Sequence, residues 1–78
     1  SNRTYKWKNS SITFLENGVL DANGKNTYYC IDTYRIKCDF DREEYLLKFD
    51  KNYSSFISIR KKDFDIVFGV EDTIKKDI

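Results

Sequence analysis

Residues 34–49 have the sequence YRIKCDFDREEYLLKF, in which two alternating runs flank a short polar segment. In the first run, apolar residues occupy every second position, at Tyr34, Ile36, Cys38 and Phe40. The second run repeats this period at Tyr45, Leu47 and Phe49. Successive side chains of a β-strand point to opposite faces, so each run predicts a strand with one buried face. The polar residues 41–44 between them predict a hairpin turn.

The same period of two recurs along the rest of the chain. It predicts strands over about 4–8, 11–16, 19–22, 27–31, 34–40, 45–50, 55–61 and 64–70. Asn17-Gly18 and Asn23-Gly24 supply the residue types that tight hairpin turns require. In the last strand we expect the buried face to carry Phe64, Ile66, Phe68 and Val70. Burial of Ile36, Phe49 and Phe68 is the central requirement of this interpretation.

These strands predict an all-β fold, a small antiparallel up-and-down meander of seven or eight short strands. A flat sheet would leave one face and both edges exposed, so we expect a barrel or a sandwich. The chain of 78 residues predicts a single domain with an ordered core over about 4–70 and a tail, 71–78, that frays or forms a short helix. Its 17% aromatic content can replace the disulfide or metal that small domains often need.

The two cysteines are expected to be free. A two-residue loop at Asp32-Thr33 would place Cys30 and Cys38 on opposite faces of a hairpin, and a three-residue loop would make them diagonal neighbours at best. A disulfide needs Cα atoms within about 7 Å. Free thiols favour a reducing, intracellular location. No apolar run approaches the roughly 20 residues of a membrane span, and no leading segment resembles a signal peptide, so we expect a soluble protein without a membrane partner.

Composition argues against several classes of function. The chain has no histidine, which removes the commonest general base at neutral pH. Without histidine, and with only two cysteines, a zinc site lacks ligands. The acidic residues of segment 39–44 are typical of a solvated hairpin loop. We therefore expect neither an enzyme nor a metal or other cofactor.

The remaining class is a non-catalytic binding module. A protein partner, including a second copy that pairs through an exposed edge strand, is the first expectation. Carbohydrate is an alternative, because Tyr5, Trp7 and Tyr29 offer flat apolar rings near polar side chains. A lone tryptophan is, however, more often part of a core.

Single-stranded nucleic acid is the rival ligand class. Basic residues that offer phosphate contacts on a small barrel are Arg35, Lys37, Arg60, Lys61 and Lys62. Aromatic residues that can stack on bases are Tyr28, Tyr29, Tyr34 and Tyr53. The net charge of +1 supplies no overall field that would attract a polyanion, which makes this alternative weaker than a protein partner.

One set of residues resembles a known family pattern that covers roughly residues 7–70. It comprises Trp7, Ile12–Gly18, Gly24, Tyr28, Phe40–Glu44, Leu47–Phe49, Tyr53–Phe56, Arg60-Lys61 and Gly69. This set resembles a small β-meander domain associated with proteins of large DNA viruses, and by analogy lipocalin-like or avidin-like meanders. The resemblance implies a β-meander in a viral protein of the host cytoplasm or virion. The family pattern has a glycine and a histidine where this chain has Asp41 and Glu44.

Overall fold

The computed structural model describes residues 3–22 and 24–72, and these form eight antiparallel strands. The strands are β1 (Arg3–Trp7), β2 (Ser10–Phe14), β3 (Val19–Asp21), β4 (Lys25–Cys30), β5 (Arg35–Phe40), β6 (Glu43–Phe49), β7 (Ser55–Arg60) and β8 (Ile66–Glu71). Each pairs with the next, and β8 pairs with β1, so the sheet closes into a barrel. The prediction of an all-β meander is confirmed, and of its two forms the barrel is the one observed.

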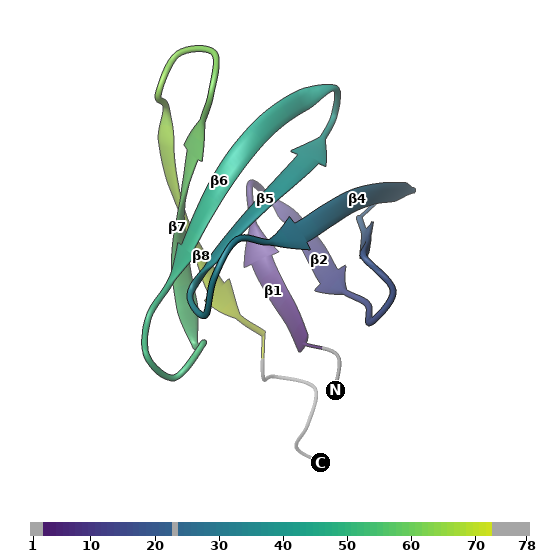
Figure 1. The fold of residues 1–78 in the computed structure, drawn as a ribbon, viewed down its shortest axis with the longest axis vertical. Helices are drawn as coiled ribbons and strands as arrows, with labels where there is room; N and C mark the ends of the chain where they lie inside the picture. Colours follow the sequence, from purple (N-terminus) through teal and green to yellow (C-terminus); the bar gives the residue numbers. More distant parts are fainter. Residues whose placement is uncertain (1–2, 23, 73–78) are drawn as a thin grey trace.

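The closure between β1 and β8 is short. Among the described residues, Tyr5 pairs with Glu71 and Lys6 with Val70, and the Asp72 N–H donates to the Thr4 carbonyl (2.9 Å). The pairing of β7 with β8 is longer and runs from Ser55 with Val70 to Ile59 with Ile66. The turn that joins β7 and β8 therefore extends beyond the barrel, at the end opposite to the chain termini (Figure 1). Part of β8 consequently lies outside the closed ring of strands.

Aromatic side chains fill the barrel. Trp7 lies 5.0 Å from Tyr45 and 6.0 Å from Phe56, and Tyr5 lies 5.3 Å from Phe56 and 5.6 Å from Phe49, all measured between ring centroids. Most of these pairs are edge-to-face, the arrangement that the ring quadrupoles favour. Among residues 3–22 and 24–72, the buried apolar core comprises Tyr5, Trp7, Ile12, Leu20, Ala22, Cys38, Tyr45, Leu47, Phe49 and Phe56.

The predicted orientation of β8 is wrong. Phe68 is 70% exposed, and Phe64, Ile66 and Val70 also lie in water, while Val67 and Gly69 face the core. The reason lies in the register, because Gly69 pairs with the buried Phe56 and Val67 with the buried Ser58. Paired residues share a face of the sheet. The other two required positions agree with the prediction, since Phe49 is buried and Ile36 packs against the core.

The two cysteines lie on the same face, so the prediction of opposite faces is wrong. The Ile31 N–H donates to the Arg35 carbonyl (2.9 Å), which lengthens the loop to three residues and pairs Cys30 with Ile36. Both thiols are nevertheless free, and only Cys38 is buried. Burial raises the pKa of Cys38 to about 12, so its thiol stays protonated and unreactive.

Two primed turns form without glycine. Lys8 and Asn9 both have positive φ between β1 and β2, as do Asp41 (54°) and Arg42 (66°) between β5 and β6. Such two-residue turns match the twist of the flanking strands but place the β-carbons of ordinary residues close to the backbone. Gly18 has positive φ as its turn requires, whereas Asn23 and the tail after residue 72 lie outside the described residues.

Arg42→Gly is expected to stabilise the domain. Arg42 is exposed, so its replacement relieves the left-handed backbone without removing a packing contact. Glycine also raises the conformational entropy of the unfolded chain, which offsets part of this gain. We expect a net rise of about 1 kcal/mol in the free energy of unfolding. The melting temperature would rise by roughly 4–8 °C. Arg42→Ala, which keeps a β-carbon, is the control, and equal melting temperatures for the two variants would contradict the interpretation.

Candidate functional site

The outward side of β8 is apolar, and Phe64, in the turn that precedes β8, extends this row of side chains. Phe64, Ile66, Phe68 and Val70 are 75%, 55%, 70% and 56% exposed. Because a free aromatic side chain presents about 150–250 Å², these four leave on the order of 400 Å² of apolar surface in water. That is the size of the largest apolar patch on an ordinary monomer, and such patches often serve a function.

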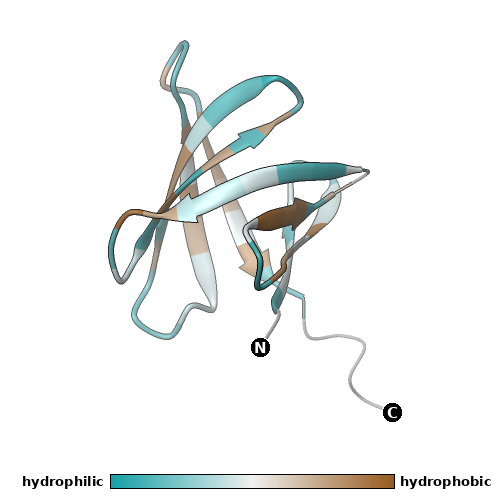
Figure 2. Cartoon of the chain, turned by 45° about the vertical axis from the view of Figure 1, so that its right-hand side comes forward, coloured by the Kyte–Doolittle hydropathy of each residue, from teal (hydrophilic) through white to brown (hydrophobic). Residues whose placement is uncertain are grey.

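Neighbouring strands extend this surface. On the outside of the barrel Ile66 pairs with Ile59, which pairs with Leu46, and Phe68 pairs with Ile57. Figure 2 shows hydrophobic stretches in the strands below the β7–β8 turn, which projects at the upper left of that view. We call this surface the outer apolar face and define it as Leu46, Ile57, Ile59, Phe64, Ile66, Phe68 and Val70.

An unpaired strand edge borders the outer apolar face. β1 ends at Trp7 and turns away at Lys8 and Asn9, so within the described ranges Ile66–Phe68 pairs only with β7. A hollow of about 390 Å³ beside this edge is lined by Phe68 and the β1–β2 turn. Alternate residues of an antiparallel strand direct their N–H and C=O groups to the same side. This edge therefore offers backbone hydrogen bonds to an added strand.

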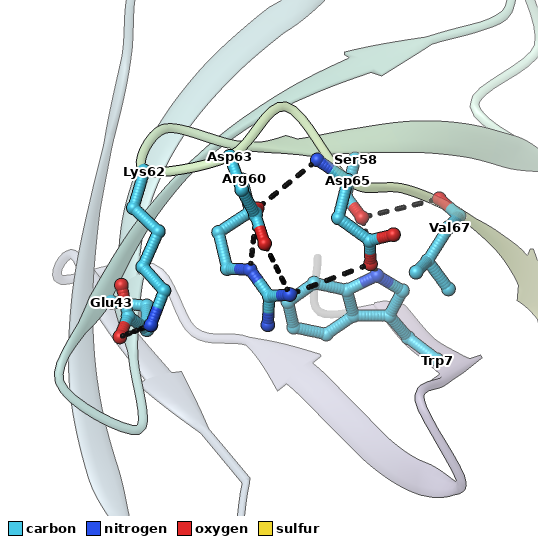
Figure 3. Close-up of polar contacts among 8 residues, drawn as sticks. All are labelled: Trp7, Glu43, Ser58, Arg60, Lys62, Asp63, Asp65 and Val67. Atoms are coloured by element: carbon cyan, nitrogen blue, oxygen red, sulfur yellow. Dashed lines mark hydrogen bonds and ion pairs between the residues drawn. The ribbon is translucent and has the colours of Figure 1, made fainter.

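The candidate phosphate-binding residues are all paired with carboxylates. Arg35 Nη2 lies 2.8 Å from Asp32, and Lys37 Nζ lies 3.1 Å from Glu44. Arg60 donates two hydrogen bonds of 3.0 Å to Asp63 and lies 3.7 Å from Asp65 (Figure 3).

These ion pairs shift the pKa values in the direction that keeps both partners charged. Hydrogen bonds from Arg60 lower the pKa of Asp63, and those from Arg35 lower the pKa of Asp32. The charges on all three basic residues are thus balanced locally, which weakens them as contacts for a phosphate backbone.

The candidate aromatic residues separate into three places. Tyr5, Tyr28, Tyr34 and Tyr53 line one cavity at an open end of the barrel. Tyr29 lies on the outside of β4, 60% exposed, with Lys37 Nζ 6.0 Å from its ring centroid. Trp7 is buried and its Nε1 donates to Ser58 Oγ (2.8 Å), so its ring faces are closed to a ligand.

Within residues 3–22 and 24–72, no group of three or more His, Cys, Asp or Glu could hold a metal ion. No helix in this part of the chain is long and apolar enough to cross a membrane.

Sequence reasoning missed the outer apolar face because it assigned Phe64, Ile66, Phe68 and Val70 to the core. One signal could have found it. In both 56–59 and 66–70, apolar residues occupy odd and even positions alike. In a barrel formed by one sheet, only one of these two sets can face inward, so the other must be exposed or covered by a partner.

Comparisons with models of protein families, with curated proteins and with solved structures give no significant match. The resemblance to a viral β-meander domain therefore stays a prediction from the sequence.

Proposed function

We propose that this chain is a non-catalytic protein-interaction module that assembles with a second copy of itself through the outer apolar face. The observation that carries the proposal is the row of exposed apolar side chains formed by Ile66, Phe68 and Val70 on β8 and by Phe64 in the turn before it, next to an unpaired strand edge. A water-exposed apolar patch of this size on a strand edge favours association.

Self-complementarity supports a second copy as the occupant. Two β8 strands related by a twofold axis run antiparallel, so each open edge can donate to and accept from the other. Asp65 precedes β8, where Arg60, Asp63 and Asp65 together carry one net negative charge, and the exposed Lys6 pairs with Val70 near the other end of the strand. An antiparallel arrangement brings the Lys6 end of one copy to the Asp65 end of the other, which joins opposite charges.

The available area suits a dimer of moderate affinity. The four exposed side chains supply on the order of 400 Å² per copy, and the flanking Leu46, Ile57 and Ile59 enlarge this area. The total approaches the lower bound of about 1,200 Å² for specific interfaces. We therefore expect a dissociation constant of about 10–100 µM.

Sedimentation velocity over a concentration series tests the proposal. We expect the wild type to shift from monomer to dimer, and Phe68→Ser to remain monomeric up to about 1 mM with an unchanged melting temperature. The control is Tyr29→Ser, which removes an exposed aromatic ring from β4 and should dimerise like the wild type. A wild type that stays monomeric at about 1 mM, or a Phe68→Ser variant that still dimerises, would refute this mode of assembly.

The nucleic-acid alternative has a separate test. Because Arg35, Lys37 and Arg60 are paired with carboxylates, we expect no salt-sensitive binding of a single-stranded oligonucleotide. Titration at two salt concentrations measures this directly. Tight binding that weakens steeply as salt rises would favour the nucleic-acid function over self-assembly.

A further inference from the structure

A second surface lies at the opposite end of the barrel from the β7–β8 turn. There the start of β1 and the ends of β2, β4 and β6 surround a cavity of about 300 Å³. Loops 31–34 and 50–54 form its rim. This volume is at the lower bound of pockets that hold small molecules. We call this cavity the aromatic mouth, lined chiefly by Tyr5, Phe14, Tyr28, Tyr34, Phe49 and Tyr53.

The rings of the aromatic mouth are held in place by one another. Phe14 meets Tyr28 edge-to-face with centroids 5.1 Å apart, and Tyr34 stacks on Tyr53 at 5.5 Å. Phe49 lies 5.8 Å from Tyr53 and joins this rim to the core. The cavity is therefore preorganised, and little free energy would be lost in ordering its side chains when a ligand binds.

Three of the tyrosine hydroxyls donate to backbone carbonyls. Tyr5 Oη donates to Tyr53 O (2.6 Å), Tyr53 Oη donates to Thr33 O (2.5 Å), and Tyr28 Oη donates to Leu15 O. Burial raises the pKa values of Tyr5 and Tyr28, so both remain neutral at physiological pH. Tyr28 and Tyr53 are partly exposed and offer ring surface to a ligand, whereas Tyr5 is only 2% exposed.

The charged residues that line the aromatic mouth are two carboxylates and one guanidinium. The Arg3 guanidinium lies 6.0 Å from the Tyr53 ring centroid, donates to the carbonyls of Asn52 and Tyr53 and lies 3.7 Å from Glu71, so its charge is balanced outside the lining. Asp32 is balanced by Arg35 at 2.8 Å. Glu16 is the third charged residue of the lining, and it adds to the negative faces of the rings.

We propose that the aromatic mouth binds a small organic cation with apolar substituents, such as a methylated or quaternary ammonium group. Aromatic faces attract a cation through their quadrupoles, and their apolar surface accepts the methyl groups. The adjacent Glu16 carboxylate supplies long-range attraction for the same charge. An anion would meet both the rings and Glu16 unfavourably, and a neutral ligand would gain only the apolar contact.

Titration with choline and with its neutral isostere 3,3-dimethyl-1-butanol tests this proposal. Both can be followed by backbone amide shifts in NMR spectra. We expect choline to shift the signals of Thr33, Tyr34 and Tyr53 and to saturate, whereas the isostere binds at least about fivefold more weakly. Equal affinity for the two probes, or no saturable shift with choline, would overturn the proposal.

Matched variants locate the binding site. Tyr34 is partly exposed on the rim, so Tyr34→Leu keeps an apolar side chain while it removes the aromatic quadrupole. We expect this variant to weaken choline binding by about fivefold or more, and Glu16→Gln to weaken it less. Tyr29→Leu, on the outside of β4, should bind like the wild type. If Tyr29→Leu weakens binding as much as Tyr34→Leu does, the aromatic mouth is not the site.

Discussion

Gly69→Ala is expected to lower the free energy of unfolding by about 3 kcal/mol, the upper part of the range for overpacked cores. A β-carbon at position 69 would lie 2.2 Å from Phe56 Cζ and 2.5 Å from Phe56 Cε2. The Phe56 ring cannot move aside easily, because it is buried against Tyr5, Trp7 and Phe49 at centroid distances of 5.0–6.0 Å. A domain of this size has a total stability of only about 4–12 kcal/mol, so the loss would be a large part of it.

Urea denaturation measures this loss, and a second substitution identifies its cause. In the Gly69→Ala background, Phe56→Leu removes the ring that collides with the new methyl group. We expect the double variant to be more stable than Gly69→Ala alone, although Phe56→Leu by itself destabilises the wild type. If the two effects simply add, the close approach of Phe56 to Gly69 is not the reason that glycine is required.

Trp7→Ala is expected to destabilise the domain more than Gly69→Ala does. Tryptophan to alanine changes in cores cost about 3–5 kcal/mol, which is comparable with the total stability of a chain of this length. Trp7 also begins a series of two hydrogen bonds in the core (Figure 3). Its Nε1 donates to Ser58 Oγ (2.8 Å), and Ser58 Oγ donates to the Val67 carbonyl (3.1 Å). Near-ultraviolet circular dichroism and amide signal dispersion would report the loss of packing.

Ser58→Ala separates the hydrogen bond from the packing. This change leaves the buried Trp7 N–H without its acceptor, and we expect a loss of about 1–3 kcal/mol with the fold retained. The control is Ser54→Ala, whose hydroxyl bonds to Asp50 at the surface and should contribute less. A Ser58→Ala variant as stable as the wild type would show that the internal hydrogen bond contributes nothing to the fold.

Local pattern predicted the strands well. The expected strands 34–40 and 45–50 correspond to β5 (Arg35–Phe40) and β6 (Glu43–Phe49), and the turn between them falls where the polar residues predicted it. The turn chemistry was harder to foresee, because Lys8-Asn9 and Asp41-Arg42 adopt primed turns although neither pair contains glycine. Strong pairing on both sides of a turn can impose a backbone conformation that local preference disfavours.

The candidate site was predicted in part. Four of the tyrosines chosen from the sequence line the aromatic mouth, although they come from positions 5, 28, 34 and 53. Their convergence depends on barrel closure, which brings the ends of distant strands together. By contrast, the basic residues Arg35, Lys37 and Arg60 each have an acidic partner that no spacing rule identified.

The amino-acid sequence by itself determined that this chain forms antiparallel hairpins, because a period of two and polar turn segments depend only on neighbouring residues. Which face of β7 and β8 points inward was decided by the tertiary structure alone. Both faces of these strands carry at least one apolar residue, so alternation is ambiguous there. The inward face is the one that carries the small residues Gly69 and Ser58. Gly69 leaves space for the Phe56 ring, and Ser58 leaves space for Trp7 and accepts its hydrogen bond. The same packing turns Phe64, Ile66, Phe68 and Val70 outward and creates the surface for which we propose a partner.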